Sequence, residues 1–385
     1  MIYDLVVSGR IVDINGVYES NIGIVGDRIK RISDGRIAGK KSLVLDDSCL
    51  IFPGFIDCHV HLREDASGKW NYKEDFVSGS RAAIHGGVTT VADMPNTPLP
   101  AISKEQVFER QKLAKKSMID VLFYGGVTTE NLSEIKKMAK LVCGYKIYFA
   151  ETTGNLILDR SKLEPTVKAI SKTKKPVVFH CHPEDLETIL KICKKYNART
   201  HIAHLSKKVE IEIIKKYKNK VQLTCETCPH YLFFTKNNRK DVKPEPGTEE
   251  DMSALLNALK DGSIDMLSTD HAPHTLEDKE NGASGFPGLD TYGNIVSWLL
   301  NEMKPEQIAQ LIMNAASFLD IDAGRIKENF IANLTILNMK KTKIRKEDLQ
   351  TKCGWSPFEG YVFPGKAIYT IYNGKILMKN GDIVI

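Results

Sequence analysis

Two histidines separated by a single residue are the first feature of this sequence that could do chemistry. His59 and His61 lie at the end of an apolar stretch, residues 55–60, whose composition is that of a buried strand. Residues two apart on a strand point to the same face, so the two imidazoles could bind one divalent cation through nitrogen. The alternative is a pair of hydrogen-bonded core residues. The nearby Asp57 and Arg63, together with histidines farther along the chain, favour the metal.

Four other apolar stretches also carry an ionisable residue at or near their ends: Lys146 within 145–149, His180 after 177–179, His204 after 200–203, and Asp270 after 264–269. Chance explains one such position more easily than all of them. We therefore expect His180 and His204 to bind a second cation.

His182 and His201 are weaker candidates for metal binding. His182 is followed by Pro183, which favours a helix start. His201 precedes His204 by three residues, so on an extended strand it should point to the opposite face. Either could still orient a metal ligand from outside the ligand set.

Lys146 lies within an otherwise apolar stretch, residues 144–149. A buried ammonium beside two dications would be strongly disfavoured. Its stem could carry the charge out to the surface. Alternatively, the free amine could react with CO₂ to form a carbamate whose two oxygens bridge the metals.

Asp270 is the candidate general base. A carboxylate at a metal site can take a proton from an attacking water and return it to a leaving nitrogen. It could instead be a simple metal ligand or the N-cap of the turn that follows. We expect Asp270 to be both a ligand and a proton shuttle.

Three residues near these positions are suited to an anion. Arg63 follows the histidine pair and can hold a carboxylate with two parallel hydrogen bonds. Asn96 lies just past the next apolar stretch, and His274 comes four residues after Asp270. Together they predict a pocket for a small substrate that carries a carboxylate.

The elements that must position these residues alternate regularly. Eight apolar, β-rich stretches cover residues 55–60, 88–94, 119–124, 145–149, 177–180, 200–204, 221–225 and 264–269, and charged, helix-periodic segments such as 104–116 and 184–195 separate them. Apolar strands separated by helices imply parallel pairing with both faces covered. A (β/α)₈ TIM barrel over residues 53–333 is therefore expected, with its chemistry at the C-terminal ends of the strands. An open doubly wound sheet is the competitor, but no glycine-rich phosphate fingerprint follows the first strand.

The two ends of the chain resemble each other and differ from the middle. Short alternating strands with turn residues occupy both, and Gly26-Asp27 has the composition of a hairpin turn. We expect residues 1–52 and 334–385 to form one small composite β-sandwich domain beside the barrel.

Composition excludes several classes of protein. The 385 residues are 42% hydrophobic and carry a net charge of +6, too weak and too dispersed for a nucleic-acid partner, although it mildly favours anionic substrates. There is no apolar run near ~18 residues and no leader-like N-terminus. Eight irregularly spaced cysteines in a chain of this length indicate a reduced, cytoplasmic, soluble protein rather than a secreted or membrane protein.

Residues 53–64 (PGFIDCHVHLRE) resemble the opening motif of the cyclic amidohydrolases, and of dihydroorotases in particular. Four further segments resemble the same family in the same order: 93–97 (DMPNT), 269–274 (TDHAPH), 285–289 (GFPGL) and 352–360 (KCGWSPFEG). Each motif is moderately specific, whereas the ordered set, which spans nearly the whole chain, is highly specific.

The resemblance implies a zinc-dependent barrel enzyme of pyrimidine biosynthesis that interconverts N-carbamoyl-L-aspartate and L-dihydroorotate. It implies two Zn²⁺ ions with a hydroxide between them as the nucleophile. The implied ligands are His59 and His61 on one ion, His180 and His204 on the other, Asp270 completing the first site, and a carboxylated Lys146 bridging both.

The resemblance also implies the substrate contacts. These are Arg63, Asn96 and His274 on the carboxylate, Thr152 from a mobile lid, and the backbone of Pro287 and Gly288 on the ring. Lys243 stands where many relatives have an asparagine near the ring. A homodimer, or association with other pyrimidine enzymes, is the expected assembly.

Two alternatives remain open from the sequence. Allantoinases and hydantoinases share the histidines and the lysine but need no group to hold a carboxylate. A barrel that serves as a scaffold would need no metal, although here all six ligand positions are filled.

Overall fold

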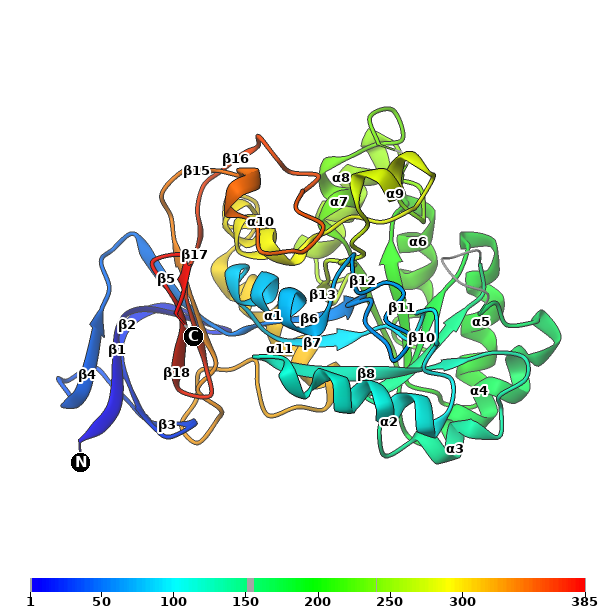
Figure 1. Ribbon diagram of the computed structural model, residues 1–385, viewed down its shortest axis with the longest axis horizontal. Helices are drawn as coiled ribbons and strands as arrows, with labels where there is room; N and C mark the ends of the chain where they lie inside the picture. Colours follow the sequence, from blue (N-terminus) through cyan, green and yellow to red (C-terminus); the bar gives the residue numbers. More distant parts are fainter. Residues whose placement is uncertain (1, 151–155, 240, 385) are drawn as a thin grey trace.

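The computed structural model describes residues 2–150, 156–239 and 241–384. Figure 1 shows a barrel of parallel strands wrapped by helices and, beside it, a β-rich part that contains both chain ends. The barrel carries the site residues, and the β-rich part packs against its flank.

Eight strands form the barrel sheet, each paired with its sequence neighbours. They are β6 (Phe55–Val60), β7 (Val88–Asp93), β8 (Asp120–Val127), β9 (Gly144–Tyr148), β10 (Val177–His180), β11 (Thr200–Leu205), β12 (Leu223–Thr227) and β13 (Met266–Leu267). All seven pairings are parallel. The ring closes just past β13, where the His61 amide donates to the His271 carbonyl at 2.7 Å. The predicted barrel is confirmed, and each of the eight predicted stretches contains or overlaps one of these strands.

Helices surround the barrel and connect its strands. They are α1 (Phe76–His85), α2 (Lys104–Leu113), α3 (Glu134–Met138), α4 (Leu163–Ser171), α5 (Pro183–Lys195), α6 (Lys208–Tyr217), α7 (Pro229–Phe233), α8 (Glu249–Lys260), α9 (Leu276–Glu280), α10 (Tyr292–Leu299) and α11 (Pro305–Leu319). Short 3₁₀ turns cover Ala114–Lys116, Arg160–Lys162, Leu289–Thr291 and Lys346–Asp348. Across the described residues, none of these helices combines the length and the apolar composition that crossing a bilayer requires.

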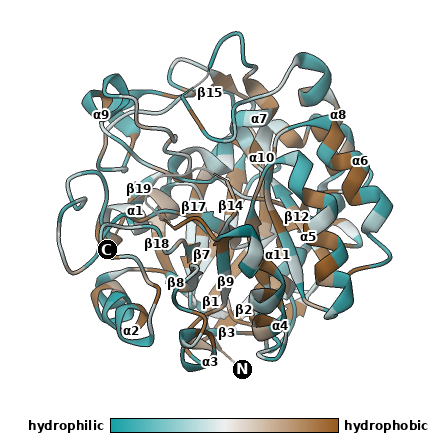
Figure 2. Cartoon of the chain, turned by 90° about the vertical axis from the view of Figure 1, so that its right-hand side faces the viewer, coloured by the Kyte–Doolittle hydropathy of each residue, from teal (hydrophilic) through white to brown (hydrophobic). Residues whose placement is uncertain are grey.

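Helix α5 illustrates why these segments fold as they do. It buries Leu186, Ile189, Leu190 and Cys193, a spacing that places all four on one side of a helix. Burying each of the larger aliphatic chains is worth roughly 1.5–3 kcal/mol. Pro183 lies in the first turn, where a missing amide hydrogen costs nothing. Figure 2 shows the resulting mixture of hydrophilic and hydrophobic residues along the helices around the barrel.

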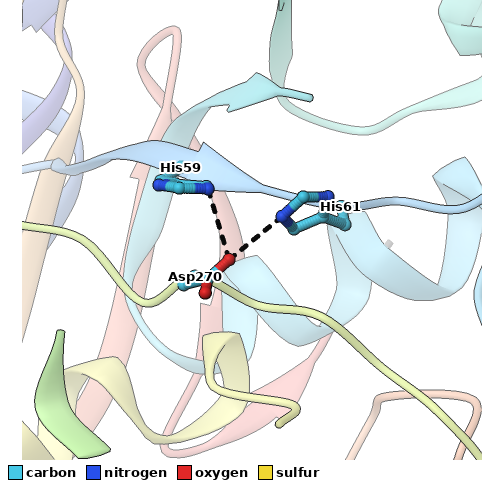
Figure 3. A group of neighbouring side chains, drawn as sticks. All are labelled: His59, His61 and Asp270. Carbon is cyan, nitrogen blue, oxygen red and sulfur yellow. Dashed lines mark hydrogen bonds and ion pairs between the residues drawn. The ribbon is translucent and has the colours of Figure 1, made fainter. Parts of the chain in front are cut away.

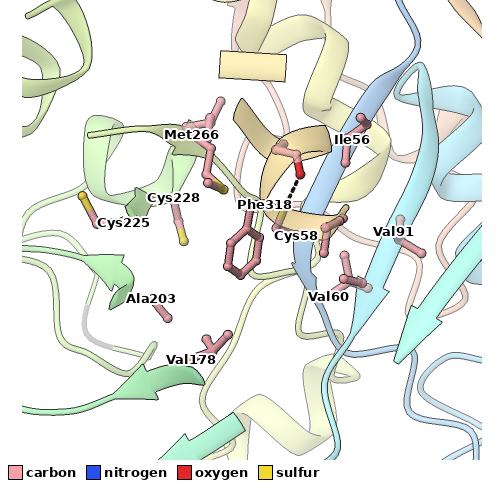
Figure 4. Packing of buried hydrophobic residues seen from close by; sticks show 14 of the residues in the cluster. Ile56, Cys58, Val60, Val91, Val178, Ala203, Cys225, Cys228, Met266 and Phe318 are labelled. Carbon is pink, nitrogen blue, oxygen red and sulfur yellow. Dashed lines mark hydrogen bonds between the residues drawn. The ribbon is translucent and has the colours of Figure 1, made fainter. Parts of the chain in front are cut away.

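The core of the barrel is continuous with the packing beneath its helices. Figure 4 shows Phe318 of α11 among buried apolar side chains from the barrel strands, such as Cys58, Val178 and Ala203. Cys58 on β6 approaches the Ala315 carbonyl of the same helix at 3.9 Å. This packing fixes the strands whose ends carry the site residues.

The β-rich part takes strands from both chain ends. β1 (Tyr3–Asp13), β2 (Gly16–Val25), β3 (Arg28–Ser33), β4 (Gly39–Val44), β5 (Cys49–Pro53), β14 (Leu334–Asn338), β17 (Lys366–Tyr372), β18 (Lys375–Lys379) and β19 (Asp382–Ile383) form one nine-stranded sheet. β15 (Thr342–Lys343) and β16 (Val362–Phe363) pair separately. The antiparallel pairing of β5 with β14 joins the two ends of the chain, and a separate apolar cluster lies within this part.

Candidate active site

His59, His61 and Asp270 converge at the C-terminal end of the barrel (Figure 3). Nε2 of His61 lies 3.0 Å from Oδ1 of Asp270, and Nε2 of His59 lies 3.3 Å from the same oxygen. All three side chains are buried. The structure therefore brings together the predicted first metal site.

The opposite ring nitrogen of each histidine is held by an oxygen acceptor. Nδ1 of His59 lies 2.5 Å from Oε1 of Glu226, and Nδ1 of His61 lies 2.7 Å from Oδ1 of Asn96. An acceptor at Nδ1 places the proton there and leaves the Nε2 lone pair facing inward. Asn96, predicted to hold substrate, thus also orients a histidine.

The donor set fits a divalent cation. Two Nε2 lone pairs and a carboxylate oxygen face one another at 3.0 and 3.3 Å, an arrangement that repels itself unless a cation or a proton lies between the atoms. Burial lowers the pKa of His61 to about 3, so this imidazole is neutral and able to act as a ligand.

Glu226 on β12 was not anticipated from the sequence. It is fully buried, and its other oxygen lies 3.4 Å from Nε2 of His201. A glutamate at the end of an apolar strand indicates a buried carboxylate, which needs a hydrogen-bond partner. The sequence does not indicate which residue that partner is.

Replacing Glu226 by Gln should weaken binding of a divalent cation by about 10- to 100-fold, the usual cost of losing an outer partner of a metal ligand. The neutral amide no longer increases the basicity of the His59 ring. Competition for Zn²⁺ with a chromophoric chelator measures the change.

Glu210→Gln is the matched control. Glu210 is also a buried carboxylate, but it accepts from the backbone amides of Ser206 and Lys207 rather than from a predicted ligand. Equal zinc affinity of the Glu226 variant and the control would refute the orienting role.

His180 and His204 form a second pair. Nδ1 of His180 lies 2.6 Å from Nε2 of His204, and the rings of His204 and His59 are 5.3 Å apart between centroids. Burial, followed by the neighbouring His180, lowers the pKa of His204 well below its usual value. The predicted second ligand pair therefore lies beside the first.

The prediction that His201 and His204 point to opposite faces of their strand is wrong. His201 pairs in register with Val178, which pairs with Lys146, and its ring reaches Glu226. His204 has φ +41°, and the pairing of β11 with β12 shifts register after Ile202, so the alternation of faces breaks before His204. His201 thus supports the carboxylate that orients His59, a role that the sequence had left open. His182, by contrast, is exposed at the N-cap of α5.

Lys146 is completely buried on β9. Among the residues that the structure describes, its Nζ has no hydrogen-bond partner; it lies 5.4 Å from the centre of the Tyr148 ring. Burial lowers the pKa of Lys146 to about 8, so about a tenth of it is the free amine at pH 7, far more than for an ordinary lysine. The alternative in which the ammonium reaches the surface is excluded by this position.

A second group of side chains surrounds Arg63, which is 2% exposed. Its Nη2 lies 3.1 Å from Nε2 of His274, and its Nε donates to the Pro273 carbonyl at 3.3 Å. Its Nη1 has no hydrogen-bond partner within the described part of the chain. Burial lowers the pKa of Arg63 to about 10, which leaves the guanidinium charged at neutral pH. A buried charged donor without an acceptor is the complement of an anion.

A narrow pocket, partly open to solvent, joins the two groups. Its lining includes His61, Asp270, Arg63 and Asn96, together with Lys243. The site thus presents converging acceptor atoms on one side and converging donors on the other. Such a pocket suits a small molecule that carries a carboxylate.

The structure bears differently on three of the predicted substrate contacts. The amide of Gly288 donates to Nδ1 of His271 at 3.1 Å, and its carbonyl accepts from Thr291, so both of its polar groups are already engaged. Contact of Pro287 with a ring stays a prediction, and Thr152 lies outside the described residues.

A further set of possible ligands was missed. Cys228, His230 and Asp270 offer one atom each within 4.8 Å of one another. The Cys-Pro-His sequence at 228–230 was the available signal.

Hydrogen bonds from Thr351 and from the segment 352–360, which resembles a family motif, reach residues beside the site. Thr351 and the Lys352 amide donate to the buried Glu74, and Nε1 of Trp355 donates to the His274 carbonyl at 2.7 Å. The hydrogen bond from Trp355 holds the backbone at His274 in place.

Comparisons with known proteins agree with this geometry. A model described as the amidohydrolase family matches residues 50–377. The dihydroorotase of Pyrococcus horikoshii is 34% identical over 411 aligned positions, which cover 99% of this chain and 93% of that protein. The multifunctional protein CAD of Squalus acanthias is 32% identical over 86% of this chain, which corresponds to 15% of the much longer relative.

The fold has close counterparts among solved structures. The L-hydantoinase (dihydropyrimidinase) from Arthrobacter aurescens superposes with a TM-score of 0.94, covering 100% of this chain and 98% of that one. At 22% identity, this likeness concerns the fold alone.

Proposed function

This chain belongs to the amidohydrolase family, and from that premise we propose that it is a dihydroorotase, interconverting N-carbamoyl-L-aspartate and L-dihydroorotate. The observation that carries the proposal is the pocket that Arg63, whose Nη1 has no hydrogen-bond partner among the described residues, lines together with His61 and Asp270. Dihydroorotate presents a carboxylate beside a cyclic amide. The pocket offers hydrogen-bond donors for the carboxylate and a cluster of potential metal ligands for the cyclic amide.

We propose two Zn²⁺ ions as cofactors, held by the ligand set His59, His61, His180, His204, Asp270 and Lys146. When bound, the cations would supply Lewis acidity, bringing the pKa of water down from ~15.7 to near ~7 and polarising a carbonyl. The nitrogen and oxygen donors of this set match the ligand preference of zinc.

Lys146 joins this set as a carbamate. Its neutral amine attacks the carbon of CO₂, the N–C bond forms as one C=O π bond opens, and one N–H proton leaves to solvent, so the amine becomes a carbamate whose single negative charge is shared by two oxygens. The missing hydrogen-bond partner of Nζ and the lowered pKa of Lys146 support this step.

Asp270 moves the proton. In hydrolysis, its carboxylate accepts a proton from the attacking water and delivers it to the ring nitrogen as the C–N bond breaks. The reverse direction uses the same transfers. Arg63 and His274 hold the carboxylate and so place the amide carbonyl over Asp270 and its histidine neighbours.

A matched pair of substrates tests the function. Dihydrouracil is dihydroorotate without the carboxylate, so a pocket built to bind that group should discriminate between them by about 10⁴-fold in kcat/KM. A higher kcat/KM for hydantoin, allantoin or dihydrouracil than for dihydroorotate would favour the hydantoinase-like alternative. Less than about one bound zinc per chain, with no turnover of any of them, would favour the scaffold.

Arg63→Ala should raise KM for dihydroorotate by about 10- to 100-fold, because each hydrogen bond to a charged group is worth roughly 1.5–3 kcal/mol. The kcat should change less, since the carboxylate contact exists in both the ground and transition states. Steady-state kinetics on both substrates separates the effects.

Arg81→Ala is the control for Arg63. Arg81 lies on the nearby α1 and donates to Gln350 outside the cavity. An unaltered KM in the Arg63 variant refutes the contact with the carboxylate.

We further propose a cytoplasmic location, with which the eight unpaired cysteines are consistent. Association with other pyrimidine enzymes, or a homodimer, stays a prediction. Sedimentation of the purified protein measures the second.

A further inference from the structure

Lys73 is a buried cation next to the proposed carboxylate pocket, and no step above uses it. The residue is 5% exposed and lies just before α1. Its Nζ is 3.1 Å from Nδ1 of His274, whose Nε2 is 3.1 Å from Nη2 of Arg63. The imidazole of His274, itself 2% exposed, is therefore held between two cationic groups.

Both ring nitrogens of His274 face a group that can only donate, Lys73 at Nδ1 and Arg63 at Nε2. A neutral imidazole has one donor and one acceptor nitrogen, so it can accept from only one of the two. A carboxylate beside Arg63 favours the tautomer with the proton on Nε2, because His274 then accepts from Lys73 and donates to the anion.

This tautomer leaves a mismatch that an anion resolves. Nε2–H of His274 and Nη2–H of Arg63 are then both donors, 3.1 Å apart, and Nη1 of Arg63 is buried with no partner in residues 2–150, 156–239 and 241–384. An oxygen anion seated against these nitrogens would accept from all of them. No neutral amide or apolar group could satisfy as many donors at once.

We propose that Lys73 is a positioning residue that holds His274 as its Nε2–H tautomer, so that His274 donates to the substrate carboxylate alongside Arg63. This inference rests on the proposed function and adds a residue through which the pocket selects an anion. Without Lys73, Nε2 can become the acceptor of an Arg63 hydrogen bond, and the pair then satisfies itself instead of the substrate.

Other contacts hold Lys73 in place. Its Nζ lies 3.3 Å from Oδ1 of Asp278. It also lies 5.1 Å from the ring centre of Trp70 and 5.4 Å from that of Tyr72. Asp278 caps α9 by accepting from the Thr275 amide. The ammonium of Lys73 thus contacts the carboxylate of Asp278, the two aromatic rings and the His274 imidazole.

The ionisation of the neighbours agrees with a neutral imidazole. Burial, then the charges of Arg63 and Lys73, lower the pKa of His274 to about 2. Burial lowers the pKa of Lys73, while Asp278 opposes that shift.

The competing explanation is that Lys73 only neutralises Asp278. Both explanations allow a loss of activity on mutation, so a direct reading of the His274 ring is needed. Nitrogen chemical shifts in protein labelled with ¹⁵N-histidine distinguish a protonated Nε2 from a bare one, and a His274→Gln variant identifies the signal.

The first measurement needs no change at Lys73. In zinc-loaded wild-type protein, His274 should show a protonated Nε2, and its proton signal should shift when dihydroorotate is added. A protonated Nδ1 overturns the proposal, whether or not the protein turns over dihydroorotate. A correct tautomer in a protein that prefers another substrate would instead contradict only the proposed function.

The second measurement uses Lys73→Met, which keeps the length of the side chain. We expect loss of the fixed tautomer and a rise in KM for dihydroorotate of about 10-fold or more, with kcat changed much less. Lys73→Arg should restore the tautomer and most of the KM. Tyr72→Phe is the control, because it removes the 2.8 Å hydrogen bond to Asp278 without touching His274. An unchanged KM and tautomer in Lys73→Met, or an equal KM effect in Tyr72→Phe, would assign Lys73 a merely structural role.

Discussion

Replacing Asp270 by Asn should lower kcat for dihydroorotate by about 10²- to 10⁴-fold, the range that a positioned acid–base group contributes. Asparagine keeps the shape and one oxygen, so it can still lie against His59 and His61. Its amide cannot take up a proton near neutral pH. Rapid-quench or steady-state kinetics gives kcat, and elemental analysis of the same sample gives the zinc content.

The zinc content separates the two roles of Asp270. A variant that keeps its metal and loses turnover has lost the proton shuttle, whereas parallel loss of both would indicate a ligand role alone. Asp261→Asn is the control, because this exposed residue at the end of α8 pairs only with Lys215 among the charged groups near it. Unchanged turnover in Asp270→Asn would reject the shuttle.

The barrel could be predicted because its signal repeats. Each of the eight stretches is apolar enough to be buried on both faces, and the segments between them have helical periodicity, as the buried positions of α5 show. The hairpin at Gly26-Asp27 was predictable for a local reason: Val25 pairs with Arg28, and Gly26 takes φ +59°. Strand β13 is shorter than predicted because the chain leaves the sheet before Asp270.

The site was only partly predictable, because backbone turns at the strand ends override the alternation of faces. Arg63, His204 and Asp270 have φ of +60°, +41° and +47°. Such values are uncommon for residues with a side chain and cluster at functional sites. A left-handed residue re-aims its side chain, so residue spacing no longer gives its direction. This is why His201 was assigned to the wrong face.

The residues that orient the proposed metal ligands and substrate contacts were harder still to predict. Glu226 lies 167 residues from His59 in sequence, and Lys73 lies 201 residues from His274. Spacing along the chain carries no information about such contacts. Only the register of the barrel strands and the course of the loops bring them together.

Lys146→Ala should remove nearly all turnover and lower zinc affinity by more than the roughly 100-fold that loss of an outer partner costs. In the proposed state, the carbamate of Lys146 would supply two oxygens that share one negative charge, so the alanine variant would lose these metal ligands. Because the side chain is fully buried, its removal also leaves a cavity at the former position of Nζ.

That cavity allows the sharpest test of the carbamate. A short carboxylic acid such as acetate or propionate fits the space and carries the same two oxygens, so millimolar amounts should restore part of the zinc binding and turnover of Lys146→Ala. Lys146→Met fills the same volume without a charge and should be inactive and insensitive to the acids. Rescue must also fail in Asp270→Asn, whose defect is a missing proton acceptor. If Lys146→Met were active, or if no acid restored Lys146→Ala, the lysine would act through packing alone and the bridging carbamate would be wrong.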